Sequence, residues 1–178
     1  MFIRHAEKPA TPPPAGVDEN GTQNQHGLTV LGWQRAGALV AFFAEPTHKK
    51  IAVPKTILAA TTSDDATIDA DDSQSLRPIV TVEPLVAKLG AAVSFVNTIP
   101  VGREDEAIAA IGACTGAVLV SWEHKRIPII AAAFTRDPPE FGDRFDPVWI
   151  LDRKRNGSYA LTIKYQELLA GDLPYSGA

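Results

Sequence analysis

The sequence predicts an α/β protein with a three-layer α/β/α arrangement: a mostly parallel sheet, helices on both faces and a C-terminal antiparallel hairpin at one edge. Short apolar runs alternate with stretches of helical periodicity as far as residue 134, which is typical of parallel sheets. Two further apolar runs flank Asn156-Gly157, a strong hairpin signal. At 178 residues, we expect a single domain over 1–178.

The expected strands are apolar runs with few charged interruptions, as strands buried on both faces of a sheet are. The first run, Met1–Ile3, is very short and leads straight into Arg4-His5. The later strands are expected at residues 55–62, 92–98, 116–122, 148–151 and 159–165.

The first expected helix begins after Thr29, a good N-cap residue, and ends at Pro46. Between them, apolar side chains recur at helical spacing as far as Phe43. Residues 9–27 precede this helix and are rich in proline, glycine and small polar residues. That composition predicts a loop, long enough to cover a site.

The later helices are shorter or interrupted. Pro78 opens a helical stretch that Pro84 is expected to break or restart, with Gly90 as its C-terminal stop. Further helices are expected at 104–114 and 128–133. The acidic stretch through Asp69, Asp71 and Asp72 is expected to be a solvated loop.

The composition restricts the possible partners. The chain is 45% hydrophobic and 21% charged, as ordinary globular proteins are, and its net charge of −4 argues against nucleic-acid binding. Cys114 is the single cysteine, which excludes an intrachain disulfide and a cysteine zinc cage. No apolar segment reaches the roughly 18 residues of a membrane span. We expect a cytoplasmic protein without membrane contact; a segment lost upstream of the short first strand would leave export open.

Two expected strands end in histidine, one at His5 and the other at His124. Parallel strands share a rim at their carboxyl ends, where ligands of α/β sheets collect. Arg4 lies beside the first histidine, and Arg77 joins the same pocket if the loop before it returns to the rim. A neutral imidazole can attack phosphorus, and a guanidinium can hold two phosphoryl oxygens. These residues therefore predict a phosphoryl site.

Four motifs occur in an order and spacing that resemble the histidine phosphatase superfamily, the phosphoglycerate mutase-like group. The resemblance covers about residues 1–135 and departs from the family in the shortness of the first strand. The motifs are R-H-A-E at 4–7, L-T-x-x-G at 28–32, R-P-x-x-T at 77–81 and V-L-V-S-W-E-H at 118–124.

The resemblance implies that His5 is the nucleophile and becomes phosphohistidine. Arg4 and Arg77 would hold the phosphoryl oxygens, and His124 would bind the same group and stabilise the transition state. The reaction implied is hydrolysis of a phosphomonoester by a phosphatase that needs no cofactor and no metal. Its substrate would be a phosphorylated small molecule or a phosphoprotein.

The general acid stays open at this point. The resemblance places it either after the third strand or beside the second histidine, which makes Glu104 and Glu123 the candidates. We favour Glu123, because its neighbour His124 fixes its place on the rim. Glu7 is a third candidate, although we expect it to orient the loop after His5.

Three alternatives remain. A mutase is less favoured than a phosphatase, because the expected elements between Arg77 and His124 leave no room for a large cap. The same fold could serve as a non-catalytic domain that binds phosphorylated ligands. A metal-dependent hydrolase using His5, Glu7 and His124 is less favoured, since both arginines would repel a cation.

Overall fold

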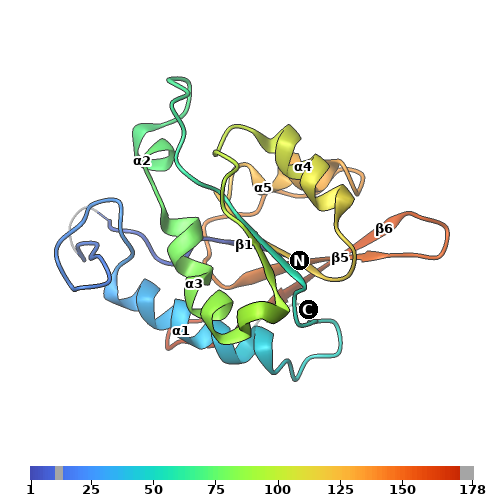
Figure 1. Ribbon diagram of the computed structural model, residues 1–178, viewed down its shortest axis with the longest axis horizontal. Helices are drawn as coiled ribbons and strands as arrows, with labels where there is room; N and C mark the ends of the chain where they lie inside the picture. The colour runs from blue at the N-terminus through green and yellow to red at the C-terminus, as the bar shows by residue number, and fades with distance from the viewer. Residues whose placement is uncertain (11–13, 173–178) are drawn as a thin grey trace.

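The computed structural model describes residues 1–10 and 14–172, which form a six-stranded sheet in the order β3-β2-β4-β1-β5-β6. β1, β2, β3 and β4 run parallel, whereas β5 is antiparallel to β1 and pairs with β6 as a hairpin at one edge (Figure 1). The predicted fold class is confirmed. The strands are β1 (Phe2–Arg4), β2 (Thr56–Ala59), β3 (Ser94–Val96), β4 (Val118–Trp122), β5 (Pro147–Arg153) and β6 (Tyr159–Tyr165).

Helices cover both faces of the sheet: α1 and α3 pack together on one side, and α4 and α5 lie on the other (Figure 1). The short α2 stands apart, beyond the ends of β2 and α3 (Figure 1). No helix among the described residues is long and apolar enough to cross a membrane. The helices are α1 (Val30–Ala44), α2 (Ala70–Ser73), α3 (Arg77–Leu89), α4 (Glu104–Ala113) and α5 (Ile127–Ala132), with a 3-10 helix η1 (Gly90–Ala92).

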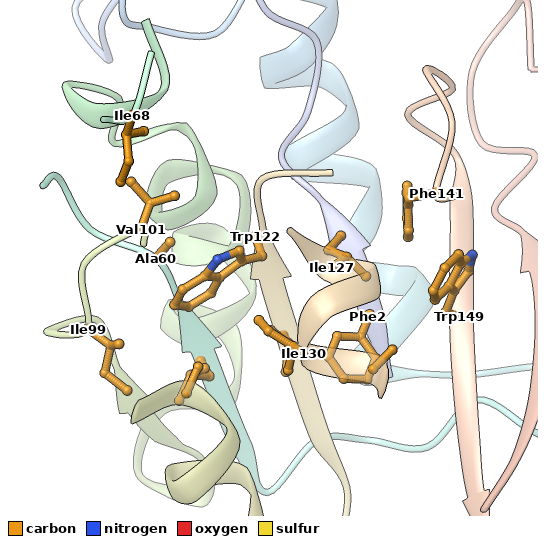
Figure 2. Close-up of a cluster of buried hydrophobic side chains, with 14 residues drawn as sticks. Phe2, Ala60, Ile68, Ile99, Val101, Trp122, Ile127, Ile130, Phe141 and Trp149 are labelled. Carbon is orange, nitrogen blue, oxygen red and sulfur yellow. The ribbon is translucent and has the colours of Figure 1, made fainter. Parts of the chain in front are cut away.

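The core has two layers because neighbouring residues of a strand point to opposite faces of the sheet. In β1, Phe2 faces the layer beneath α4 and α5, whereas Ile3 faces the layer beneath α1 and α3. Figure 2 shows the first of these layers, in which Trp122 at the end of β4 packs near Ile127 and Ile130 of α5. Burial on both faces holds the strand ends rigidly at the rim.

Three local expectations were wrong. α3 continues through Pro84 without a break, because its inward side chains, such as Val82 and Leu85, are buried. That burial offsets the roughly 3 kcal/mol that an internal proline costs a helix. The strand expected at 92–98 is only Ser94–Val96, and η1 precedes it. The acidic stretch that we expected to be a solvated loop contains α2.

Candidate active site

The register between β1 and β4 brings the two histidines to the same rim. Arg4 lies opposite Trp122, and the backbone N–H of His5 donates to the Trp122 carbonyl at 3.2 Å. The chain therefore leaves both strands at the same level, with His5 beside the Glu123-His124 pair. The parallel pairing of β1 with β4, which the sequence predicted, is sufficient to bring the two histidines to the same rim.

The His5 ring is buried and held in one orientation. Its Nδ1 lies 2.7 Å from the Ala6 carbonyl oxygen, which can only accept, so Nδ1 carries the proton and Nε2 keeps its lone pair. The Ala6 N–H donates to the Thr81 hydroxyl at 2.8 Å, which fixes this turn to α3. Burial, together with the positive charge of Arg4, lowers the pKa of His5 to about 3. The imidazole is therefore neutral at physiological pH.

The Arg4 guanidinium stacks 4.0 Å from the centre of the Phe145 ring and donates through Nη1 to the Asp143 carbonyl. Burial lowers its pKa to about 10, which leaves it charged at neutral pH. Its Nε is buried and has no hydrogen-bond partner among the described residues. An unsatisfied buried donor costs about 1–3 kcal/mol, so Arg4 is poised to receive an acceptor.

Arg77 is buried at the start of α3 and is held mainly by protein groups. Its Nη1 and Nη2 donate to the two carboxylate oxygens of Asp71 at 3.0 and 2.6 Å. Nε donates to the Gly27 carbonyl at 3.1 Å, and Nη2 also donates to the Gln25 carbonyl at 2.8 Å. Arginine has five N–H donors, so these bonds leave one for a ligand. Its charge nevertheless contributes to lowering the pKa of His5.

Glu123 and His124 directly follow β4, and their side chains lie against each other. His124 Nδ1 lies 2.8 Å from Glu123 Oε1 but is not aligned for a hydrogen bond, and His124 Nε2 lies 3.6 Å from Asp143 Oδ1. Glu123 Oε1 accepts from the Lys125 N–H at 3.0 Å. Burial raises the pKa of Glu123, but His124 and the Lys125 N–H outweigh it, and the net shift is downward. Glu123 is therefore ionised at neutral pH.

Glu104, the alternative acid, has its carboxylate occupied by structural contacts. Oε1 accepts from Trp122 Nε1 at 3.0 Å and from the Gly102 N–H at 2.9 Å. Oε2 accepts from Arg126 Nη1 at 3.0 Å. These bonds tie the start of α4 to the end of β4 and the start of α5, which accounts for the burial of this carboxylate.

Glu7 is held by Arg35 of α1, whose Nη2 and Nε donate to its carboxylate at 2.7 and 2.9 Å. This agrees with an orienting role for Glu7 in the loop after His5. The bonds to Arg35 also occupy the Glu7 carboxylate, which the metal-hydrolase alternative requires as a ligand together with His5 and His124. In the described part of the chain, no three His, Cys, Asp or Glu side chains are grouped closely enough to hold a metal ion.

The structure adds residues that the sequence did not identify as part of the site. A small pocket is lined by His5, Glu123 and Asp72, with Thr61, Ser75 and Pro78 among its walls. Asp72 was expected in a solvated loop, and only its placement in three dimensions brings it here. A larger cavity, of about 510 Å³, lies at the opposite ends of the strands, beside Met1 and Gly116, and is lined by no histidine.

No family model matches the sequence, and no curated protein matches it either. Among solved structures, the chain is similar to the protein histidine phosphatase SixA, solved in complex with tungstate. The TM-score is 0.56 and the sequence identity is 12%, with 93% of this chain and 95% of the SixA chain covered. The fold of this chain is that of a histidine phosphatase, as the resemblance of its motifs implied.

Proposed function

We propose that this chain, which has the histidine phosphatase fold, hydrolyses phosphomonoesters through a phosphohistidine formed on His5. The observation that carries the proposal is the state of the His5 ring. It is buried, neutral and hydrogen-bonded through Nδ1, which presents the lone pair of Nε2 as a nucleophile.

The surroundings of His5 support an anionic substrate. The buried Arg4 Nε lacks a hydrogen-bond partner among the described residues. A phosphoryl group would give Arg4 an acceptor and compensate its buried charge. His124 would bind the same group from the neighbouring strand end, and Arg77 would add positive charge through its one remaining N–H.

The reaction would proceed in two steps. In the first, Nε2 of His5 attacks phosphorus while the ester oxygen departs; in the second, water attacks the phosphohistidine and releases phosphate. The charge on the equatorial oxygens of the transition state would be balanced by Arg4, Arg77 and His124. These side chains already supply the positive charge that a metal ion would otherwise bring, so the mechanism that we propose uses none.

Glu123, which we favoured from the sequence as the acid, has a lowered pKa and would be ionised at the start of the reaction. A general acid has to carry a proton at the operating pH. In the proposed site, the Glu123 carboxylate instead fixes the orientation of His124, because Glu123 Oε1 lies 2.8 Å from His124 Nδ1.

The substrate would be a phosphorylated protein or a phosphorylated small molecule. The similarity to SixA, a protein histidine phosphatase, favours the first. Only short elements, namely the rest of α3, η1, β3, α4 and β4, lie between Arg77 and His124, and they provide no large cap over the site. A site without a large cap suits a phosphatase better than a mutase.

The test is a panel of phosphomonoesters and phosphopeptides assayed with wild-type protein and with His5→Ala. Loss of a covalent nucleophile should reduce turnover by roughly 10³–10⁶-fold. Vanadate binding, measured by calorimetry, should weaken less, because Arg4 and His124 remain. His48→Ala, in an exposed turn beyond the other end of α1, is the matched control and should retain full activity. Comparable turnover in His5→Ala would refute the proposal.

A further inference from the structure

Two adjacent carboxylates on α2 have opposite surroundings. Asp71 accepts hydrogen bonds from Arg77 and, at 2.9 Å, from Lys8, and these hold the pKa of its carboxyl far below the ordinary range. Asp72 has the Lys8 ammonium 4.0 Å from its carboxylate, and its side chain is only 12% exposed. In many enzymes, two neighbouring carboxylates have environments that separate their pKa values. One then stays ionised, and the other carries the proton that a general acid needs.

Asp71 and its partners fix the position of α2. The Asp71–Arg77 pair joins α2 to the first turn of α3, and the Ser63 N–H donates to the Ser73 carbonyl at 2.8 Å. Asp72 is thereby held on the pocket side, where it lines the same small pocket as His5 and Glu123. A carboxyl in this place borders the same pocket as the nucleophilic ring of His5.

The charges around Asp72 favour its protonated form. Burial raises the pKa of its carboxyl, and the negative charge of Glu123 raises it further. Glu123 is the ionised member of this pair because His124 and the Lys125 N–H stabilise its charge. Other charged groups act on Asp72 or lie in its pocket, and the net shift is still upward. The charged groups are Lys8, Lys125, Asp71 and Arg4, and the neutral ring of His5 lines the same pocket.

We propose that Asp72 is the general acid of the reaction, a role that rests on the proposed function above. In the first step the bond between phosphorus and the ester oxygen breaks, the bond from phosphorus to Nε2 of His5 forms, and the Asp72 proton passes to the departing oxygen. In the second step the Asp72 carboxylate takes a proton from the attacking water. The phosphorus–nitrogen bond then breaks, which releases phosphate and restores neutral His5 and protonated Asp72.

This assignment uses an acid from the segment between β2 and α3, rather than the glutamates at 104 and 123. Glu104 has both carboxylate oxygens bound by Trp122, Gly102 and Arg126. Glu123 is ionised, so it can orient His124 but has no proton to give. Asp72 combines a place in the pocket with a carboxyl pKa that burial and the charge of Glu123 raise.

The experiment compares an alkyl phosphate with p-nitrophenyl phosphate in Asp72→Asn. An alkoxide needs a proton to depart and a nitrophenolate does not, so general acid loss should slow the alkyl ester by about 10²–10⁴-fold and the nitrophenyl ester only mildly. Asp64→Asn, which replaces an exposed aspartate of the same segment between β2 and α3, is the matched control and should behave as wild type. Calorimetric vanadate binding checks that Asp72→Asn keeps its pocket.

The pH dependence of turnover tests the same role in wild-type protein, so it does not depend on whether Asp72→Asn folds. Wild-type turnover of the alkyl ester should fall on the basic side as Asp72 loses its proton, while turnover of the nitrophenyl ester should fall much less. Equal behaviour of the two esters, in wild type or in Asp72→Asn, would overturn the role of Asp72, as would leaving-group dependence found in Glu123→Gln instead. Activity that survives His5→Ala would overturn the proposed function, and the role of Asp72 with it.

Discussion

The neutral state of His5 follows from its neighbours. Burial and the charge of Arg4 lower its pKa from the ordinary 6.5 to about 3, while the Ala6 carbonyl fixes the tautomer. In the unfolded chain the same imidazole takes up a proton as the pH falls through about 6.5. Between these two values the unfolded state binds more protons than the folded state, so the free energy of unfolding rises with pH.

We therefore expect acid to destabilise wild-type protein more than His5→Gln. The contribution of His5 is fully present above about pH 6.5 and is lost as the pH falls from there towards 3. Urea unfolding at about pH 4.5 and about pH 7 measures the difference, and other titrating groups cancel in the comparison. His48→Gln, which replaces an exposed histidine, is the control. The same pH dependence in His5→Gln and wild type would contradict the pKa of His5.

Among individual residues, the sequence suggested some members of the candidate site and gave no indication of others. Arg4-His5 was recognisable because a polar pair directly follows an apolar run. Asp71 and Asp72 were not, because a cluster of aspartates normally indicates solvent. Their positions depend on Arg77, which lies beyond α2 and whose bonds to Asp71 no local pattern reveals.

Among the elements, α1 determines the path of the chain after His5. Thr29 caps α1 by accepting from the Gly32 N–H, and its own N–H donates to the Glu7 carbonyl at 2.9 Å. A Cβ on Gly32 would lie 2.6 Å from that carbonyl oxygen, closer than any real contact allows. The glycine of the L-T-x-x-G motif therefore lets the start of the helix touch the segment that carries His5.

Gly32→Ala should thus displace the His5 segment and lower both stability and turnover. Overpacking of this kind typically costs about 1–3 kcal/mol. Gly37→Ala is the matched control, because a Cβ there meets no atom within 4 Å, and it should stabilise α1 by about 0.5–1 kcal/mol. Urea unfolding and turnover are measured on both variants. If the two variants are indistinguishable, α1 does not control the His5 segment.

The errors at the level of elements have physical reasons. Pro84 carries a strong helix-breaking signal, but the buried inward face of α3 outweighs it, and burial is a property of the fold. The helix expected from Thr29 was found because its cap, its apolar spacing and its length all agree. Where local sequence signals conflict, as at Pro84, packing in the folded protein determines whether the helix continues.

For the molecule as a whole, the topology was predictable and the walls of the site were not. Parallel strands that end in histidine must place both at one rim, which the pairing of β1 with β4 shows. The loop between α5 and β5 has no periodic pattern, yet it brings Phe145 over Arg4 and the Asp143 carbonyl to the same guanidinium. Such contacts arise from packing between segments that are distant in the sequence.

The central claim is that His5 becomes covalently phosphorylated during turnover. The most direct measurement is rapid quenching of wild-type protein with a radiolabelled phosphomonoester under alkaline conditions, followed by mapping of the label. The account predicts an acid-labile phosphohistidine on His5 that forms before phosphate is released and is absent from His5→Ala. Turnover without a labelled intermediate, or a label that persists in His5→Ala, would contradict it.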